Sequence, residues 1–286
     1  MRIALHSALA NVGRLDAVVA EVRRTAEYGL SGYWSAMLAG QDTLTALAVA
    51  GREVPGLEFG TAVVPIPLRS PYALAQQVAT VQEAVDGRLV LGLGTSHETF
   101  VRTTFGGTWS SPVEAMRAYL DDLARVVSAQ DAGRVVTARY ATPVVLGAVN
   151  PAMVAVAAQR ASGVVTWAAG PATIRDVVQP AIAGRDEPFR IVASLPVCVT
   201  GDEAAAQEYI HARLGANDRL PSYQKVLQRE RVGGVAELSL VGTLAEVRRQ
   251  LDAFAEVGVT DFAAHPVTPG EREAEQTWEA LGELAR

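Results

Sequence analysis

The feature that most constrains the fold is a regular alternation between short apolar segments and longer segments with helical spacing of apolar residues. Eight of the short segments have the composition of strands that are buried on both faces. These expected strands cover residues 2–5, 32–35, 57–64, 88–93, 143–146, 163–167, 190–199 and 261–265. Strands that alternate with helices form parallel sheets, because each crossover helix returns the chain to the same edge.

The length of the chain selects among parallel folds. Eight βα units in 286 residues predict an α/β protein with one closed (β/α)8 TIM barrel, spanning residues 1–286 as a single domain. No linker rich in Pro, Gly or charge marks a second domain. Residues 96–111 and 215–240 are longer than ordinary connections and are predicted as insertions in the βα loops, where barrels of this type build their active sites.

The composition excludes several classes of function. A net charge of -6 argues against nucleic acid as a partner, and no apolar run is long enough for a membrane span. The single cysteine, Cys198, cannot form an internal disulfide, so a cytoplasmic protein is expected. Lys225 is the only lysine, so Schiff-base chemistry would depend on a residue in a helical stretch. Arginine in place of lysine, with abundant alanine, indicates a bacterial source.

Histidines gather where the expected strands end. His6, His97 and His265 follow strands, whereas His211 lies in a helix and is expected to be solvated. The sequence has no HxH or HExxH pattern and few carboxylates at strand ends, so no metal site is predicted. It also lacks the GxSxG elbow of a serine hydrolase.

Two segments could bind an anion through their backbone. Residues 92–97 (GLGTSH) match the first two glycines of a dinucleotide fingerprint, but His97 replaces the third, and no Rossmann half is evident. The N–H groups and hydroxyls there could still hold an anion. Residues 168–174 (AAGPATI) open a helix, whose N-terminus attracts negative charge. A tight turn and ordinary helix capping are the simpler alternatives.

Several blocks resemble the bacterial luciferase-like oxidoreductase superfamily, most closely its branch that uses the deazaflavin coenzyme F420. They include residues 61–77 (TAVVPIPLRSPYALAQQ), 87–97 (GRLVLGLGTSH) and 163–176 (GVVTWAAGPATIRD), and the similarity spans nearly the whole chain. The resemblance implies a (β/α)8 barrel that holds the deazaflavin at its C-terminal mouth. It also implies a non-prolyl cis peptide bond at Ala62–Val63, a small-molecule substrate and a homodimer.

The resemblance assigns the site by position. The implied cofactor-binding residues are Thr61, Ala62, Val63, Gly94, Thr95, Ser96, His97, Trp167, Ala168, Ala169, Gly170, Pro171 and Thr173. The chain departs from the pattern at Ser70, where relatives have histidine, and in residues 34–37, which lack the histidine proton donor that many members carry. The candidates for that role are therefore His6, His97 and His265, with Glu98 as a further one.

The leading hypothesis is an F420-dependent oxidoreductase that transfers a hydride between the deazaflavin and a small organic substrate. The reaction would reduce C=N, C=C or C=O, or oxidise an alcohol. The alternatives are a two-component monooxygenase that uses FMN, a non-catalytic flavin-binding protein and an unrelated sugar-phosphate barrel enzyme. Further expectations concern the lining of the mouth and the cofactor tail. The aromatic residues expected at the mouth are Trp34, Phe105, Trp109 and Trp167, and the arginines expected to meet an anionic cofactor tail are Arg69 and Arg102.

Overall fold

The computed structural model describes residues 1–128 and 139–286. Its strands form one parallel sheet in the order β10-β1-β2-β3-β5-β6-β7-β8-β9, which closes because β10 pairs with both β1 and β8. The strands are β1 (Arg2–Ser7), β2 (Gly32–Ser35), β3 (Glu58–Thr61), β4 (Val64–Pro65), β5 (Leu89–Gly94), β6 (Val144–Gly147), β7 (Gly163–Trp167), β8 (Arg190–Val199), β9 (Leu240–Gly242) and β10 (Asp261–Pro266). The predicted (β/α)8 barrel is confirmed.

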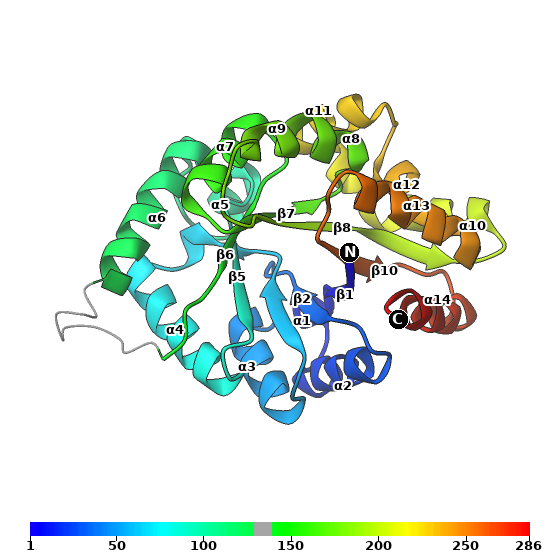
Figure 1. The fold of residues 1–286 in the computed structure, drawn as a ribbon, viewed down its shortest axis with the longest axis horizontal. Helices are drawn as coiled ribbons and strands as arrows, with labels where there is room; N and C mark the ends of the chain where they lie inside the picture. Colours follow the sequence, from blue (N-terminus) through cyan, green and yellow to red (C-terminus); the bar gives the residue numbers. More distant parts are fainter. Residues whose placement is uncertain (129–138) are drawn as a thin grey trace.

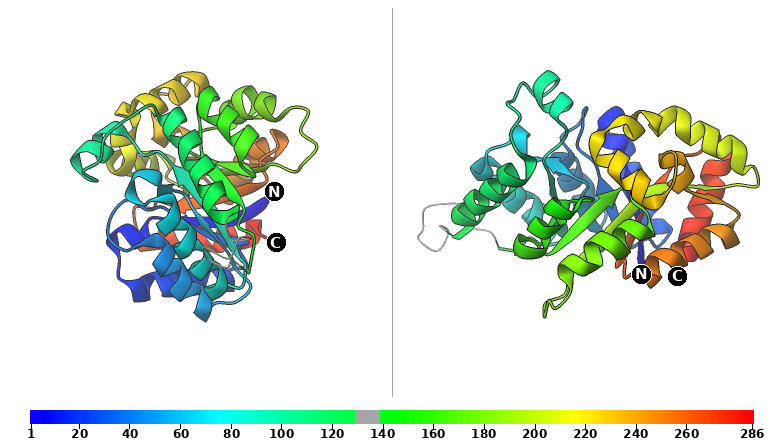
Figure 2. Two further views of the ribbon diagram at one scale, coloured as in Figure 1. Left: turned by 90° about the vertical axis from the view of Figure 1, so that its left-hand side faces the viewer. Right: turned by 90° about the horizontal axis from the view of Figure 1, so that it is seen from above.

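Helices surround the sheet, and the two termini lie close together (Figures 1 and 2). The helices are α1 (Leu9–Val12), α2 (Leu15–Glu27), α3 (Thr43–Glu53), α4 (Pro71–Ala84), α5 (Glu98–Thr103), α6 (Pro112–Ser128), α7 (Pro151–Arg160), α8 (Pro171–Thr173), α9 (Gln179–Ile182), α10 (Glu203–Leu214), α11 (Pro221–Glu230), α12 (Val235–Leu238), α13 (Leu244–Glu256) and α14 (Glu271–Leu284). Side-chain caps begin several of them. The Asp42 carboxylate accepts from Thr45 N, and Thr243 and Glu246 form a capping box.

The third barrel strand carries a bulge. β3 pairs Gly60 with Val90, and β4 pairs Val64 with Leu93. Between these two pairs the segment from β3 to β4 advances four residues, whereas β5 advances three, so the β3–β4 segment contains one extra residue. The bulge contains the cis peptide bond between Ala62 and Val63, which confirms the bond implied by the family resemblance.

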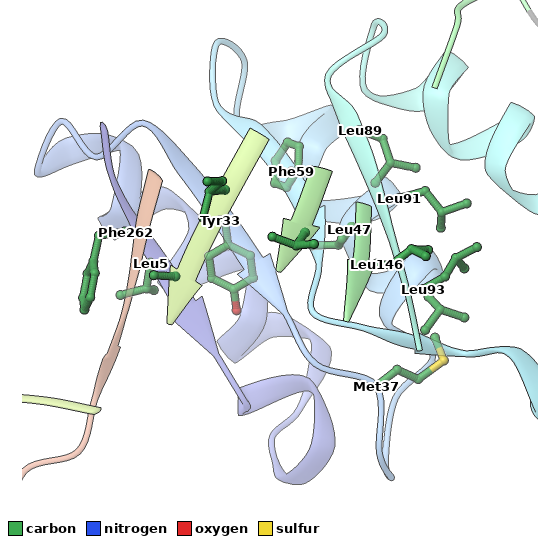
Figure 3. Packing of buried hydrophobic residues seen from close by; sticks show 14 of the residues in the cluster. Leu5, Tyr33, Met37, Leu47, Phe59, Leu89, Leu91, Leu93, Leu146 and Phe262 are labelled. Carbon is green, nitrogen blue, oxygen red and sulfur yellow. The ribbon is translucent and has the colours of Figure 1, made fainter. Parts of the chain in front are cut away.

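Among the described residues, apolar side chains pack in three clusters, of which the smallest lies between β8, β9, α10 and α12 and the other two position the site. The larger cluster fills the space between the outer face of the strands and the helices, where Leu89, Leu91 and Leu93 project from one strand (Figure 3). The smaller of these two clusters fills the barrel itself. It consists of Ala4, Trp34, Val90, Val145, Val165, Val192 and Ala263, with Ala62 and Val63 packed against it. Because a strand points alternate side chains to opposite faces, these residues define which positions face the barrel axis.

The N-terminal end of the barrel is closed by four charged residues, here called the floor network: Arg2, Glu58, Arg190 and Asp261. The Arg190 guanidinium donates to both oxygens of Asp261, at 2.9 and 2.8 Å, and also pairs with Glu58. Arg2 reaches the Asp261 carboxylate at 2.6 Å. The Arg190 guanidinium also lies 5.2 Å from the centre of the fully buried Trp34 ring.

The loop regions differ most from expectation. A single helix was expected over residues 171–183, but α8 and α9 are joined by a π-helical turn over Ile174–Val178. Pro180 explains this turn, because proline lacks the N–H that a regular α-helix would use and its ring crowds the preceding turn. Within residues 215–240, α11 matches the expected helix, whereas α12 and the start of β9 were not expected.

Candidate active site

Four side chains meet at the C-terminal mouth of the barrel and are here called the mouth cluster: His6, Trp167, Ser194 and His265. The ring centres of His6 and His265 are 5.2 Å apart. Trp167 lies edge-on to both, at 5.3 Å from His6 and 5.4 Å from His265. The Ser194 hydroxyl lies 2.7 Å from His6 Nδ1. Two of the three predicted catalytic histidines are therefore neighbours.

Strand alternation explains why these four residues converge. Ala4, Val165, Val192 and Ala263 all belong to the cluster inside the barrel. Each member of the mouth cluster lies two residues further along the same strand, so it faces the same axis one layer higher. Barrel closure then brings β10 next to β1, and with it His265 next to His6.

The two imidazoles differ in their hydrogen-bond partners. His6 Nδ1 meets the Ser194 hydroxyl, whereas His265 Nδ1 lies 2.9 Å from the carbonyl oxygen of His6. His6 Nε2 is buried and has no hydrogen-bond partner among the described residues. Burial lowers the pKa of His6 well below its usual value, and the nearby His265 lowers it further. Burial also lowers the pKa of His265, against the opposing effect of its bond to the His6 carbonyl.

His97, the third predicted catalytic residue, lies apart from this pair. It precedes α5, and its ring packs 5.7 Å from the Tyr223 ring of α11 and 6.3 Å from Phe100. Burial lowers the pKa of His97 and raises that of Tyr223 to about 12. The structure thus joins His97 to the inserted α11, not to the mouth cluster.

The bulge residues predicted to support the cofactor ring are held by neighbouring strands. The Thr61 hydroxyl both donates to Gly92 O and accepts from Gly92 N, each at 2.8 Å, so it ties β3 to β5 where the bulge interrupts regular pairing. The Val63 side chain fills the space beside two glycines. A Cβ at Gly94 would lie 2.4 Å from Val63 Cγ2, and one at Gly147 would lie 3.3 Å from Val63 Cγ1. Absent side chains on β5 and β6 therefore make room for this segment.

The predicted anion loop after β5 turns sharply. Gly94 is buried, Thr95, Ser96 and His97 are half-buried, and Ser96 has the positive φ of 63°. That left-handed conformation redirects the backbone at the edge of the mouth. The Thr95 hydroxyl lies 3.5 Å from the carbonyl oxygen of Ser96, which is long for a hydrogen bond, so this hydroxyl is weakly bonded.

The second predicted anion site already holds a carboxylate of this chain. Glu230, at the end of α11, accepts from Ala172 N at 3.1 Å and from Thr173 N at 2.7 Å. It also accepts from the Thr173 hydroxyl, and Gly170 lacks a Cβ that would lie 2.6 Å from Glu230 Oε2. Ala168, with φ of 53°, and Ala169 are buried just before this turn. The backbone chemistry predicted for residues 168–173 is present, but Glu230 uses it.

Several side chains expected at the mouth have other partners. Trp34 is wrong as a lining residue, because it is buried inside the barrel above the floor network. Arg69 pairs with Asp42 and donates to Gln77, and Arg102 forms an exposed pair with Glu98. Phe105 and Trp109 are half-buried in the loop before α6, and His211 is exposed as expected.

Neither a metal cluster nor a membrane-spanning helix is found among the described residues. Residues 1–128 and 139–286 hold no cluster of three His, Cys, Asp or Glu side chains that could bind a metal ion. In the same ranges, no helix has both the length and the apolar character required to span a membrane.

Comparison with known proteins decides the family. Residues 3–261 match the family described as luciferase-like monooxygenase. The chain belongs to this luciferase-like family. The matched range includes the bulge, both anion loops and three members of the mouth cluster.

Sequence relatives of this luciferase-like protein come from mycobacteria. One from Mycobacterium tuberculosis, named "Putative coenzyme F420-dependent oxidoreductase", is 25% identical over 318 residues, covering 88% of this chain and 90% of the relative. An uncharacterized protein of Mycobacterium bovis is 27% identical over 293 residues, covering 87% of this chain and 84% of the relative. Family and relatives together support an oxidoreductase.

Solved structures with the same fold bind two kinds of cofactor. An F420-dependent secondary alcohol dehydrogenase in complex with an F420–acetone adduct has 15% identity and a TM-score of 0.77, covering 100% of this chain and 99% of that one. The F420-dependent tetrahydromethanopterin reductase of Methanopyrus kandleri has 18% identity and a TM-score of 0.79, covering 99% and 97%. The oxygenating constituent of 3,6-diketocamphane monooxygenase from Pseudomonas putida, solved with FMN, has 15% identity and a TM-score of 0.75, covering 99% and 97%. At these identities the likeness establishes the fold alone.

Sequence reasoning missed two functional candidates in this luciferase-like chain, Ser194 and Glu230. Ser194 lies within a strand, two residues after Val192. This spacing could have shown that Ser194 faces the barrel axis, as Val192 does. Glu230 ends a helix in the long insertion, and nothing in its sequence context pairs it with Thr173.

Proposed function

We propose that this protein is a coenzyme F420-dependent oxidoreductase that transfers a hydride between the deazaflavin and a small organic substrate at the barrel mouth. The observation that carries the proposal is the Nε2 atom of His6 within the mouth cluster, which is buried and has no hydrogen-bond partner in the described part of the chain. An unsatisfied buried polar atom costs roughly 1–3 kcal/mol, and a ligand that bonds to it recovers that energy. The relative with an F420-dependent name supports the choice of cofactor.

The described residues fit the ring end of such a cofactor better than its tail. Thr61, Ala62 and Val63 would support the ring from the bulge, and Trp167 offers an aromatic surface beside the two histidines. Gly94–His97 would hold the phosphate end. Residues 168–173 would do so only after Glu230 leaves Ala172 and Thr173. When bound, the deazaflavin supplies a carbon that accepts or gives the hydride. The chain orients it, excludes water and handles the proton.

A two-component monooxygenase that uses FMN is the second candidate. The matched family description and the FMN-bound structure with the same fold favour it. It would use the same mouth with reduced FMN and oxygen. A non-catalytic flavin-binding protein is a third, because residues 34–37 lack the family's histidine.

Titration of the purified protein with coenzyme F420 and with FMN tests the proposal. We expect saturable binding of F420, followed by loss or recovery of deazaflavin absorbance when a substrate panel is added. Tight binding of FMN alone, with oxygen-dependent turnover in the presence of a flavin reductase, would establish the monooxygenase instead. Binding without turnover of any substrate would favour the non-catalytic protein. The cytoplasmic location and the homodimer stay predictions for cell fractionation and light scattering.

A further inference from the structure

The two mouth histidines are neighbours, but their Nδ1 atoms have different hydrogen-bond partners. His6 Nδ1 faces a hydroxyl, which can donate or accept, and His265 Nδ1 faces a carbonyl, which only accepts. Because the partner of one ring nitrogen fixes the tautomer, it also fixes what the other nitrogen offers to a ligand. Neither Nε2 has a hydrogen-bond partner among the described residues.

The Ser194 hydroxyl determines the state of His6. Ser194 is completely buried, and within the described residues its hydroxyl has no partner other than His6 Nδ1. If Nδ1 carried a proton, the hydroxyl hydrogen of Ser194 would be buried without an acceptor. The network therefore assigns the serine as donor and Nδ1 as acceptor. Neutral His6 then carries its proton on Nε2 and presents a donor.

The His6 carbonyl determines the state of His265 in the opposite way. His265 Nδ1 must donate to this oxygen, so in the neutral ring Nε2 carries a lone pair and can accept a proton. Proton uptake at Nε2 leaves the Nδ1–H···O=C bond intact, and a carbonyl partner stabilises the imidazolium. The hydroxyl bonded to His6 does not stabilise a cation there, because it already donates to Nδ1.

A charge on one of these rings disfavours a charge on the other. Their centres are 5.2 Å apart, so two imidazolium ions would repel each other strongly in a buried site. His265 is the one titratable neighbour whose charge shifts the pKa of His6, and no carboxylate shifts that of either ring in the described parts of the chain. The hydrogen bond to the carbonyl opposes the fall in the pKa of His265, so the proton resides there first.

Resting on the proposed function, we propose that His265 Nε2 is the general acid–base of this site, that His6 Nε2–H binds the same substrate oxygen as a neutral donor, and that Ser194 is a positioning residue for His6. The reacting group is then a carbonyl–alcohol couple. An oxygen has two lone pairs, so it can accept the His6 N–H while it exchanges a proton with His265. A protonated imine nitrogen has no lone pair left for His6, and a C=C bond has none at all.

The step balances in both directions. In oxidation, the alcohol C–H bond breaks as a hydride passes to an oxidised deazaflavin or flavin, and the O–H bond breaks as its proton passes to His265 Nε2. The C=O bond forms, and the carbonyl oxygen keeps the hydrogen bond from His6. His265 then releases its proton to water. In reduction, a reduced deazaflavin or flavin supplies the hydride and protonated His265 supplies the proton.

Nitrogen-15 NMR of the histidine side chains of the full chain, without cofactor, tests the assignment directly. We expect His6 to show the pattern of Nε2 protonation and His265 that of Nδ1 protonation. Ser194→Ala should change the His6 pattern, and Ser194→Thr should preserve it. Ser35→Ala is the matched control, because Ser35 is also a buried serine but its hydroxyl has no partner within the described residues. The reverse protonation pattern on either ring would overturn the proposal.

Turnover with secondary alcohols and their ketones provides the second measurement. His265→Gln should lower kcat by about 10²- to 10⁴-fold and remove the histidine limb of the pH–rate profile, because the proton-transfer residue is lost. His6→Gln should lower the rate and keep that limb. If His265→Gln binds cofactor and keeps the wild-type rate, the proposal fails. If no deazaflavin or flavin binds but the NMR patterns are as expected, the proposed function fails and the donor–acceptor pair stands.

Discussion

Both ends of the barrel concentrate polar groups on the axis, but the two ends differ in how completely these groups are paired. At the floor, the Asp261 carboxylate meets Arg190 and Arg2, and Arg190 also reaches Glu58. At the mouth, His6 has one partnered nitrogen and one without a partner among the described residues. Trp34 and a ring of aliphatic side chains lie between the two layers.

The difference separates the residues that hold the barrel together from those proposed to act on a ligand. Charges at the floor neutralise one another, so the floor offers little to a small molecule. The mouth keeps unsatisfied hydrogen-bonding capacity, which destabilises the folded chain slightly but is available for binding. Each prediction below would weaken this contrast if it failed.

The largest expected effect is at the floor. Asp261→Ala should lower the free energy of unfolding by about 3–5 kcal/mol, because it removes the buried carboxylate that pairs with both Arg190 and Arg2 and leaves the half-buried Arg190 with Glu58 alone. Urea denaturation measures this change. Arg248→Ala is the control, since Arg248 and Glu283 form an exposed pair, for which about 0–1 kcal/mol is expected. Equal losses in the two variants would show that the floor network does not stabilise the barrel.

The mouth should make stability depend on pH. The folded chain lowers the pKa of His6 and His265, so these rings bind protons less readily than they do in the unfolded chain. Their contribution is therefore complete above the unfolded pKa of about 6.5 and is lost as the pH falls below it, by up to about 1.4 kcal/mol per pH unit for each ring. The free energy of unfolding, measured from about pH 7.5 to about pH 5.5, should depend less steeply on pH in His6→Asn than in the wild-type chain.

The exposed His211 supplies the control for this measurement. His211→Gln should leave the pH slope of the free energy of unfolding unchanged. An unchanged slope in His6→Asn would mean that His6 titrates alike in the folded and unfolded states, which would weaken the contrast with the floor.

The smallest effect concerns Glu230, an anion at the mouth that a ligand could replace. Glu230→Gln removes its charge but keeps an oxygen for Ala172 or Thr173. If residues 168–173 bind the cofactor phosphate, the Glu230 carboxylate competes with that phosphate, and this variant should bind F420 severalfold more tightly. Removing roughly 1.4 kcal/mol of competition would tighten binding by about tenfold, which is the upper limit expected. Fluorescence titration measures the affinity. Glu237→Gln, on the nearby α12, is the matched control, and tighter binding in that variant as well would refute direct competition at Thr173.

The sequence was enough to predict the barrel because alternation and length leave few other folds. The same logic identified His6 and His265, since parallel strands in a closed barrel bring their carboxyl ends together. The pairing of these two histidines required knowledge of register, which short apolar strands do not reveal. Trp34 shows the same limit, because its direction depends on which residues of β2 face the axis.

Contacts made by the long insertion could not be predicted. Glu230 reaches Thr173 across 57 positions of sequence, and neither residue has a pattern that selects the other. Arg69 was expected to meet an anionic ligand, but Asp42, the cap of α3, lies within its reach. The sequence shows that an arginine needs an anionic partner, but only the packing of the helices shows which carboxylate it contacts.

The apolar layer formed by Trp34 and its aliphatic neighbours inside the barrel has a consequence for the proposed proton transfer. The cluster consists of aliphatic side chains and the Trp34 indole, and it separates the mouth histidines from the carboxylates of the floor. If the mouth histidines exchange protons as proposed, those protons would travel through the opening that admits the substrate. Product departure and the restoration of the starting protonation state then share one passage, so a bulky product would delay both.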